Sequence, residues 1–319
     1  MKYQTNRESN MRGQVSEKLM DFLEQVNQAI AQAKADNIPF SPPIVRENFN
    51  NLSALVTHSP DVTLVENRLL KSNERDIPVR VYSPNPDEEL PIVLYFHGGG
   101  HMGGNLDLYD PICRKISVAG HCIVISVDYR LAPEHPYPEG LNDCKYVLTH
   151  FDELLAGIAY NNNITIAGDS AGGAICSSLS MLSLEDKSLK IDKQVLIYPS
   201  VDYTMTSQSF SENGEGFLLE QSKVKWYFDN YFQNNEDRAK ASPLHGNFTS
   251  ALPQSLVLTA GCDPLRDEGL AYIGALTSAG VAVTHFQFDD MIHAFMNLED
   301  LVPEECEELY KRVGQFIKS

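Results

Sequence analysis

The residues Gly168 to Gly172 form a Gly-Asp-Ser-Ala-Gly pentapeptide that can present a serine nucleophile. A strand-like run, Ile164 to Ala167, precedes the pentapeptide and a helical pattern follows it. On a strand-turn-helix of this kind the serine hydroxyl projects from a sharp turn, and glycines let the backbone pass closely. We therefore predict that Ser170 is the nucleophile of an acyl-transfer reaction. The neighbours that shape its turn are Gly168, Asp169 and Gly172.

A serine hydroxyl is a poor nucleophile unless a base accepts its proton and an acid orients that base. In enzymes with this turn, the chain order is serine, acid, histidine. Of the nine histidines, only His285 and His293 follow the candidate acids. His285 lies inside an alternating run that would hold it on a strand, whereas His293 follows that run in a loop that can reach Ser170. We predict that His293 is the base.

The orienting acid is the least constrained of the three residues. The candidates are Asp263, Asp267, Glu268, Asp289 and Asp290. Asp263 directly follows a strand-like run, and ligand-binding groups of open α/β sheets gather at the carboxyl ends of strands. Asp289 and Asp290 lie so near His293 in sequence that orienting its ring from the same loop would be awkward. We predict Asp263 and keep the other two as alternatives.

A second glycine-rich segment, His97-Gly98-Gly99-Gly100, follows the apolar run Ile92 to Phe96. Acyl transfer creates an oxyanion, and glycines let backbone amides approach it closely. We predict that the amides of Gly99, Gly100 and Ala171 form this oxyanion hole. The segment matches neither a dinucleotide fingerprint nor a phosphate-binding loop with its lysine, so no nucleotide cofactor is expected.

The composition of the chain indicates which classes of ligand or partner it can bind. With 25 Lys and Arg against 43 Asp and Glu, the formal net charge is −18, which disfavours nucleic acids and anionic membranes and favours a neutral or cationic ligand. Residues 1–18 lack the apolar core that a secretory signal needs, and no apolar run is long enough for a membrane span. We therefore expect a cytoplasmic protein. The six cysteines show no metal-binding spacing, and we expect neither a metal nor a disulfide. The oligomeric state stays open, with a homodimer as one alternative.

The elements that must position these residues alternate between strands and helices. After about Val62, short apolar runs alternate with helical patterns, which predicts a mostly parallel sheet with helices on both faces. The first two runs, separated by Lys71 to Asp76, are expected to form an antiparallel hairpin at its edge. The stretch Pro303 to Ile317 is expected to form a last helix that covers the sheet. The fold class is therefore α/β.

Two segments outside this alternation are expected to form a cap. Apolar residues at three- and four-residue spacing predict an amphipathic helix from Val15 to Ile30, and Pro39, Pro42 and Pro43 then break the pattern. Within 201–243 an aromatic-rich helix is predicted over 217–232. The connection that contains it is longer than a simple turn between strands, and connections of this length commonly form lids. The expected organisation is a cap segment at 1–60, a catalytic core at 61–200 and 244–319, and a lid at 201–243.

The chain resembles the hormone-sensitive-lipase family of bacterial esterases, and acetyl esterases within it. The matching stretches are HGGGHMGGNLDLYD from His97, VDYRLAPEHPYP from Val127, GDSAGG from Gly168, CDPLRDEG from Cys262 and IHAF from Ile292. Together these motifs span roughly Pro91 to Phe295. The resemblance departs from the family pattern at His101, where an aromatic residue is frequent, and at Ala294, where glycine is common.

The resemblance implies a capped α/β-hydrolase fold and a carboxylesterase that acts on short acyl esters without a cofactor. It places the triad on Ser170, Asp263 and His293 and the oxyanion glycines on Gly99 and Gly100. A small ester is then the expected partner. The alternatives are a noncatalytic small-molecule receptor on the same fold, an amidase and a long-chain lipase.

Overall fold

A computed structural model describes residues 14–72 and 74–319, and in this part of the chain eight strands form one sheet. The expectations for residues 1–13 and for Asn73 lie outside the described residues. The strands are β1 (Leu64–Leu70), β2 (Ile77–Ser83), β3 (Leu90–Phe96), β4 (Ile123–Val127), β5 (Tyr160–Asp169), β6 (Lys193–Ile197), β7 (Gln254–Cys262) and β8 (Val283–Ile292). These strands coincide with the apolar runs VTLVENRLL, IPVRVYSP, PIVLYFHGGG, CIVISVDYR, NITIAG, QVLIYPS, SLVLTAG and VTHFQFDD, on which the expectation of a mostly parallel sheet depends.

The strands follow the order β1-β2-β4-β3-β5-β6-β7-β8 across the sheet. The pairs β1–β2 and β2–β4 are antiparallel, and every pair from β4 to β8 is parallel. The expected hairpin at the sheet edge is therefore confirmed. Because the strands from β4 to β8 run in one direction, their carboxyl ends meet at one edge, where α/β sheets hold their ligands.

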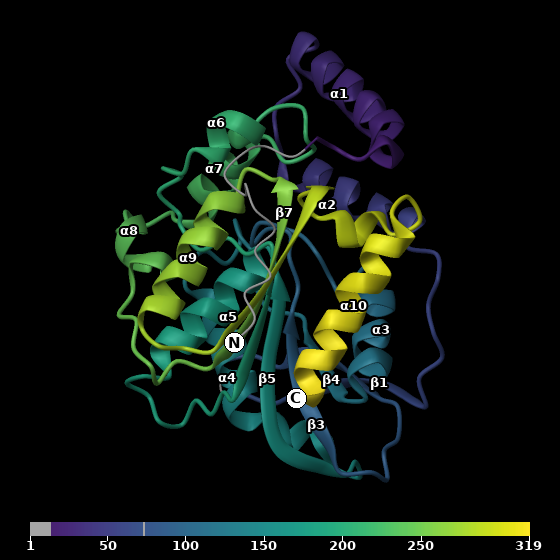
Figure 1. Ribbon diagram of the computed structural model, residues 1–319, viewed down its shortest axis with the longest axis vertical. Helices are drawn as coiled ribbons and strands as arrows, with labels where there is room; N and C mark the ends of the chain where they lie inside the picture. The colour runs from purple at the N-terminus through teal and green to yellow at the C-terminus, as the bar shows by residue number, and fades with distance from the viewer. Residues whose placement is uncertain (1–13, 73) are drawn as a thin grey trace.

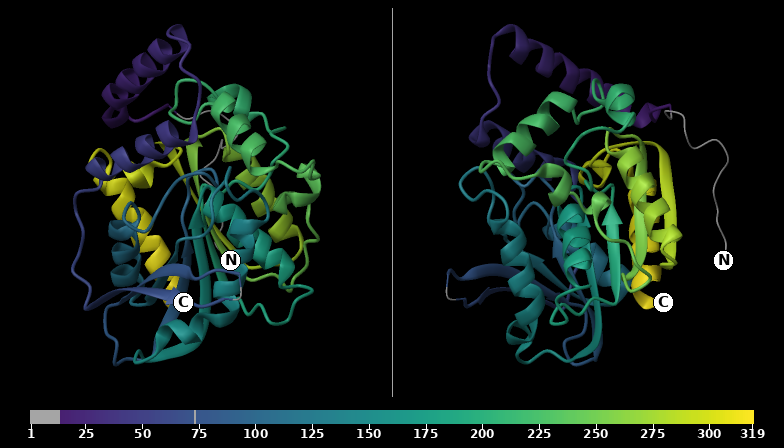
Figure 2. Two further views of the ribbon diagram at one scale, coloured as in Figure 1. Left: turned by 180° about the vertical axis from the view of Figure 1, so that it is seen from behind. Right: turned by 90° about the vertical axis from the view of Figure 1, so that its left-hand side faces the viewer.

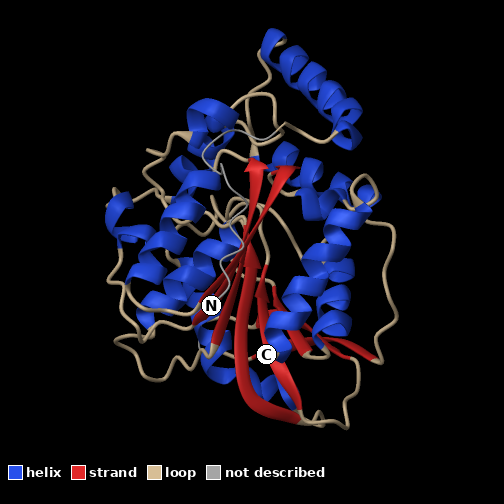
Figure 3. Ribbon diagram, in the orientation of Figure 1, coloured by secondary structure: helices blue, strands red, loops and turns tan. Residues whose placement is uncertain are grey.

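Helices cover both faces of the sheet (Figure 3). The helices α3 (Asp110–Gly120) and α10 (Pro303–Lys318) pack on one face, where Ile112 and Val313 are buried in a common core. The helices α4 (Glu139–His150), α5 (Ala171–Leu182) and α9 (Arg266–Ser278) pack on the other face, where Cys144 and Leu276 are buried. Strands buried on both sides explain why their sequences are almost continuously apolar.

The remaining helices gather at the carboxyl edge of the sheet (Figures 1 and 2). They are α1 (Met20–Ala35), α2 (Pro42–Asn51), α6 (Ser209–Asn213), α7 (Gln221–Tyr231) and α8 (Arg238–Ala241). Short 3-10 turns occur around the described chain at Glu17–Leu19, Leu52–Leu55, Phe151–Leu155, Pro243–His245 and Phe295–Leu298. The helices α6, α7 and α8 lie between β6 and β7 in sequence. No helix within the described residues is long and apolar enough to cross a membrane.

Three helices differ from the sequence expectation. Helix α7 spans only Gln221–Tyr231 and so begins later than the helix predicted over 217–232. Helix α1 begins later and continues to Ala35, because the alanine-rich stretch after Ile30 has high helix propensity. Pro42 and Pro43 begin helix α2 instead of merely breaking a pattern. The first helical turn needs no amide donor there, and the fixed φ of proline suits it.

Candidate active site

Ser170 occupies the turn between β5 and α5 with φ 52° and ψ −117°. Residues that carry a Cβ seldom adopt a positive φ, so the surrounding structure must hold this conformation. The amide of Ser170 donates to the carbonyl of Ile197 at 2.9 Å, and its carbonyl accepts from the amide of Ser200 at 3.1 Å. The turn is thus held by the neighbouring strand β6 and its exit, and it projects the hydroxyl from the carboxyl edge of the sheet.

The glycines of the pentapeptide allow α5 to begin in close contact with the sheet. A Cβ on Gly172 would lie 1.8 Å from the carbonyl oxygen of Phe96, at the end of β3. A Cβ on Gly168 would lie 2.5 Å from the carbonyl carbon of Gly172. Any side chain at these two positions would therefore displace backbone, which explains the residue types on both sides of the serine.

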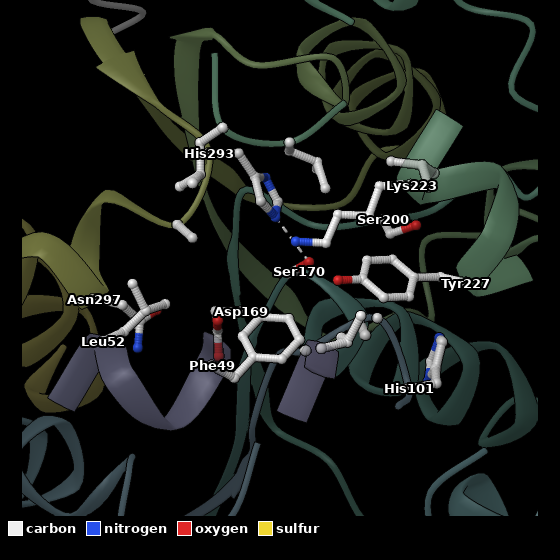
Figure 4. Close-up of a pocket in the computed structure, with 18 of the residues that line it drawn as sticks. Phe49, Leu52, His101, Asp169, Ser170, Ser200, Lys223, Tyr227, His293 and Asn297 are labelled. Atoms are coloured by element: carbon white, nitrogen blue, oxygen red, sulfur yellow. Dashed lines mark hydrogen bonds between the residues drawn. The ribbon is translucent and has the colours of Figure 1, made fainter. Parts of the chain in front are cut away.

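His293 lies between Ser170 and Asp263. Its Nε2 is 2.9 Å from the Ser170 Oγ, and its Nδ1 is 2.8 Å from the Asp263 Oδ2 (Figure 4). A carboxylate only accepts, so the Nδ1–H donates to Asp263 and Nε2 is left to accept the serine proton. All three residues follow strands, namely β5, β7 and β8, and Asp263 and His293 are almost fully buried.

Three of the other four candidate acids have partners elsewhere, and the Asp290 side chain forms no hydrogen bond with His293 among the described residues. Asp267 accepts from the Ser209 amide at 2.9 Å, and Glu268 accepts from the Val201 amide at 2.8 Å. Asp289 accepts from the Gln287 side chain at 2.8 Å. None of these side chains forms a hydrogen bond with His293 in the described part of the chain. His285 contacts the Thr259 hydroxyl at 2.9 Å on the sheet.

The segment from His97 to Gly100 forms the wall beside Ser170. Gly99 and Gly100 line the same pocket as Ala171 and have φ values of 119° and 63°, which suit glycine. Among residues 14–72 and 74–319, no acceptor is hydrogen-bonded to the amides of Gly99, Gly100 or Ala171. Three free donors next to a serine hydroxyl are the arrangement that an oxyanion requires.

Buried polar groups fix this segment from behind. The Asp169 carboxylate accepts from the Gly98 amide at 2.8 Å and from the hydroxyls of Tyr95 at 2.8 Å and Tyr109 at 3.0 Å. The His97 ring donates through Nδ1 to the Gly98 carbonyl at 2.8 Å, and burial lowers its pKa to about 4, so the ring is neutral. His97 and Asp169 therefore position the backbone amides next to Ser170.

Comparison with known proteins gives the family of the chain. Residues 93–297 match the family model described as the alpha/beta hydrolase fold. The chain is 36% identical over 255 residues to the carboxylesterase NlhH of Mycobacterium tuberculosis, covering 78% of this chain and 80% of that protein. The chain belongs to the α/β-hydrolase family. The match confirms the resemblance to the hormone-sensitive-lipase group within this family.

Other relatives of this α/β hydrolase are also named as esterases. The chain is 32% identical over 273 residues to an ethyl acetate hydrolase of Pseudomonas putida, covering 83% of this chain and 86% of that protein. An esterase from Pyrobaculum calidifontis superposes with a TM-score of 0.83 at 31% identity, covering 96% of this chain and 98% of that chain. The superposition on the Pyrobaculum esterase extends over nearly all of this chain.

The two departures from the family pattern both occupy positive-φ positions of this hydrolase. His101 has φ 59°, and its ring stacks on Tyr231 with 3.8 Å between centroids, so it takes the place of an aromatic residue. Ala294 has φ 61° and ψ 23°, the left-handed conformation that glycine adopts most easily. Ala294 directly follows His293, so the backbone turns sharply where the imidazole is presented.

The pocket of this α/β hydrolase also has walls that the sequence analysis did not predict. Phe49 and Leu52 enter from α2 and its end, Lys223 enters from α7, and Asn297 enters from the 3-10 turn after His293 (Figure 4). Lys223 stands four residues before Tyr227 in the aromatic-rich helix, a helical spacing that could have indicated a shared face. No such spacing pointed to Phe49, because the helix α2 that carries it was not predicted. No group of three or more His, Cys, Asp or Glu in the described chain is arranged to hold a metal.

Proposed function

We propose that this α/β hydrolase is a serine carboxylesterase in which Ser170 is the nucleophile, His293 the general base and Asp263 the residue that orients His293. The observation that carries the proposal is the continuous path of contacts from the Ser170 hydroxyl through both ring nitrogens of His293 to Asp263. The names of the relatives, which include a carboxylesterase and an ethyl acetate hydrolase, support ester cleavage.

The reaction proceeds in two steps. His293 accepts the Ser170 proton as Oγ attacks the ester carbonyl, and the amides of Gly99, Gly100 and Ala171 stabilise the tetrahedral oxyanion. His293 then protonates the alkoxide leaving group, so the alcohol departs and an acyl-serine remains. In the second step His293 accepts a proton from water, the resulting hydroxide attacks the acyl-serine, and the proton returns to Oγ as the acid leaves. Asp263 keeps the ring oriented and stabilises its charged form.

We further propose that the helices at the carboxyl edge form a cap of two parts, one within 1–60 and one within 201–243. Val45 and Phe49 of α2 and Val224 and Tyr227 of α7 all contribute to the pocket that contains Ser170. An ester bound there would touch both parts of the cap as well as the catalytic core. Such a partly closed apolar site suits short acyl chains.

Replacing the nucleophile tests the catalytic assignment. Ser170→Ala removes Oγ, and hydrolysis of p-nitrophenyl acetate should fall to the background rate, while far-UV circular dichroism keeps its wild-type form. Ser183→Ala is the matched control because Ser183 ends the same helix and lies outside the pocket. A fluorophosphonate should also label the wild-type peptide that contains Ser170. Undiminished turnover by Ser170→Ala would refute the assignment.

A substrate series tests the class of reaction. Rates on p-nitrophenyl acetate, butyrate and palmitate should fall steeply with chain length, and an aryl amide of the same acid should be cleaved far more slowly. Fastest cleavage of palmitate would indicate a lipase, and comparable cleavage of the amide would indicate an amidase. Saturable binding of an ester without release of alcohol would indicate a receptor.

A further inference from the structure

Two polar groups on one face of α7 point into the pocket. Lys223 and Tyr227 are four residues apart, so they lie one above the other on the helix. Both side chains line the pocket, and the amino group of the first and the hydroxyl of the second extend toward Ser170 (Figure 4). Neither group takes part in the acyl-transfer steps described above.

The amino group of Lys223 has no anionic partner within the described chain. It lies over two aromatic rings, 5.7 Å from the centroid of Phe49 and 5.9 Å from that of Tyr227. Glu220, the carboxylate one turn earlier, forms an ion pair with Lys34 at 3.0 Å instead. Burial lowers the pKa of the Lys223 ammonium, because the charge has lost part of its hydration. A bound anion would replace the solvation that this charge lacks.

The hydroxyl of Tyr227 is buried and makes no hydrogen bond within the part of the chain that is described. Tyr227 is only 4% exposed, and its ring is packed so closely on the oxyanion segment that a Cβ on Gly100 would lie 2.6 Å from it. A buried hydroxyl nearly always has a partner, and an unpaired one costs free energy. Its position in the pocket indicates that the missing partner is part of the ligand.

The acidic groups of the site do not neutralise Lys223. Asp169 accepts three hydrogen bonds from the chain, and Asp263 accepts from His293 and from the Leu265 amide at 2.8 Å. The net charge of −18 is distributed over the whole molecule, and solvent screens exposed charges beyond about 10 Å. Hydrogen bonds from the chain therefore already stabilise both carboxylates, whereas the Lys223 ammonium has no anionic partner among the described residues.

We propose that the substrate is an ester that also carries a carboxylate, bound by the Lys223 ammonium and the Tyr227 hydroxyl. This inference rests on the proposed esterase function and specifies its substrate class. Lys223 contributes the charge and Tyr227 donates one hydrogen bond, while Phe49 and the Tyr227 ring contact the apolar part of the substrate. The carboxylate belongs either to the acid part of the ester, as in a dicarboxylic monoester, or to the alcohol part, as in an acetylated hydroxy acid.

Two pairs of substrates distinguish these positions. For the acid part, monoethyl succinate is compared with ethyl levulinate, a neutral ketone of the same shape. For the alcohol part, 3-acetoxybenzoate is compared with 3-acetoxybenzamide. The measured quantity is the ratio of kcat/KM for the anionic ester to kcat/KM for its neutral partner. Comparing this ratio between variants removes the intrinsic difference in reactivity between the two esters.

Lys223→Met should lower the ratio by about tenfold or more in one of the two pairs, the order expected for a partly desolvated ion pair. Lys223→Arg keeps the charge and should retain most of the ratio, Lys223→Glu should lower it further, and Tyr227→Phe should lower it less than Lys223→Met. Lys225→Met is the matched control, because Lys225 is on the same helix, 66% exposed and paired with Asp229. Its ratios should equal those of the wild type.

The same experiment separates this inference from the proposed function. If Lys223→Met and the wild type have equal ratios in both pairs, the inference is overturned, although the esterase function stands. A variant that loses activity equally on anionic and neutral esters would show that Lys223 supports the structure or the chemistry, and this too would overturn carboxylate recognition. If the wild type does not cleave p-nitrophenyl acetate at all, the esterase function itself fails.

Discussion

The backbone amide of Gly98 donates a hydrogen bond of 2.8 Å to the carboxylate of Asp169, the residue directly before Ser170. This bond joins the segment that carries the oxyanion donors to the turn that carries the nucleophile. The hydroxyls of Tyr95 and Tyr109 donate to the same carboxylate, so one buried group fixes the spacing between the two halves of the site.

Asp169→Ala should therefore impair both stability and catalysis. It leaves two hydroxyls and an amide without their acceptor in the core, and it should lower the free energy of unfolding by about 3 kcal/mol. We expect kcat/KM to fall at least tenfold, because the oxyanion donors lose their position. Urea unfolding and p-nitrophenyl acetate kinetics measure the two effects. Asp169→Asn keeps one acceptor oxygen and should lose less; wild-type kcat/KM in Asp169→Ala would contradict the positioning role.

Asp263→Asn should reduce kcat/KM by about 10³-fold with little loss of stability. The carboxamide still accepts from the Leu265 amide, but its NH₂ group faces the Nδ1 of His293 and favours the wrong tautomer. Asp289→Asn is the matched control, because Asp289 is bonded to Gln287 and has no contact with the ring. Steady-state kinetics of both variants show which carboxylate orients His293. A larger loss in Asp289→Asn than in Asp263→Asn would assign the acid to the other carboxylate.

Two glycine substitutions should change stability in opposite directions. Gly172→Ala introduces a Cβ 1.8 Å from the Phe96 carbonyl oxygen and should destabilise the protein by at least about 3 kcal/mol or prevent folding. Gly274→Ala lies within α9, where a Cβ meets nothing within 4 Å, and should stabilise by about 0.5–1 kcal/mol. Chemical unfolding measures both. A stable Gly172→Ala protein would show that α5 can move away from β3.

The two buried histidines His97 and His101 should each reduce stability as the pH drops from 7 to 5. Burial lowers the pKa of His97 to about 4 and that of His101 to about 3, from 6.5 in the unfolded chain. Below pH 6.5 the unfolded chain therefore binds protons that the folded protein does not, and unfolding becomes more favourable. Each histidine contributes about 2 kcal/mol of this loss by pH 5.

Replacing one of these histidines tests the linkage. His101→Phe keeps an aromatic ring against Tyr231 and should make the fall in the free energy of unfolding between pH 7 and pH 5 smaller by about 2 kcal/mol. His58→Phe is the control, because His58 is exposed. If His101→Phe has the same pH dependence as the wild type, His101 is protonated in the folded protein as readily as in the unfolded chain.

The central strands could be predicted in detail because they are buried on both faces. Continuous apolar runs such as Ile92 to Phe96 have no other stable location, so the segments that form strands could be predicted, whereas their order across the sheet was not predicted. The helices at the carboxyl edge were less predictable. Val45 is the only buried residue of α2, and a helix with so narrow an apolar contact gives little periodicity.

The residues proposed for catalysis could be singled out from the sequence for a different reason. Ser170 and the segment before Gly100 stand at strand ends, where residue type and backbone geometry are tightly coupled. Lys223 was not predicted as a site residue, because a lysine in an amphipathic helix is usually exposed. Only the packing of α7 against Phe49 shows that this lysine faces inward.

The residues proposed for chemistry and those proposed for substrate choice come from different kinds of structure. The former follow strands β3, β5, β7 and β8 of one sheet, whereas Lys223 and Tyr227 stand on one short helix inside the connection between β6 and β7. Substitutions in α7 can therefore change the substrate contacts without changing the strands that carry the proposed catalytic residues. A new set of side chains on the pocket-facing side of α7 would change which esters are accepted, while the residues proposed for the reaction remain in place.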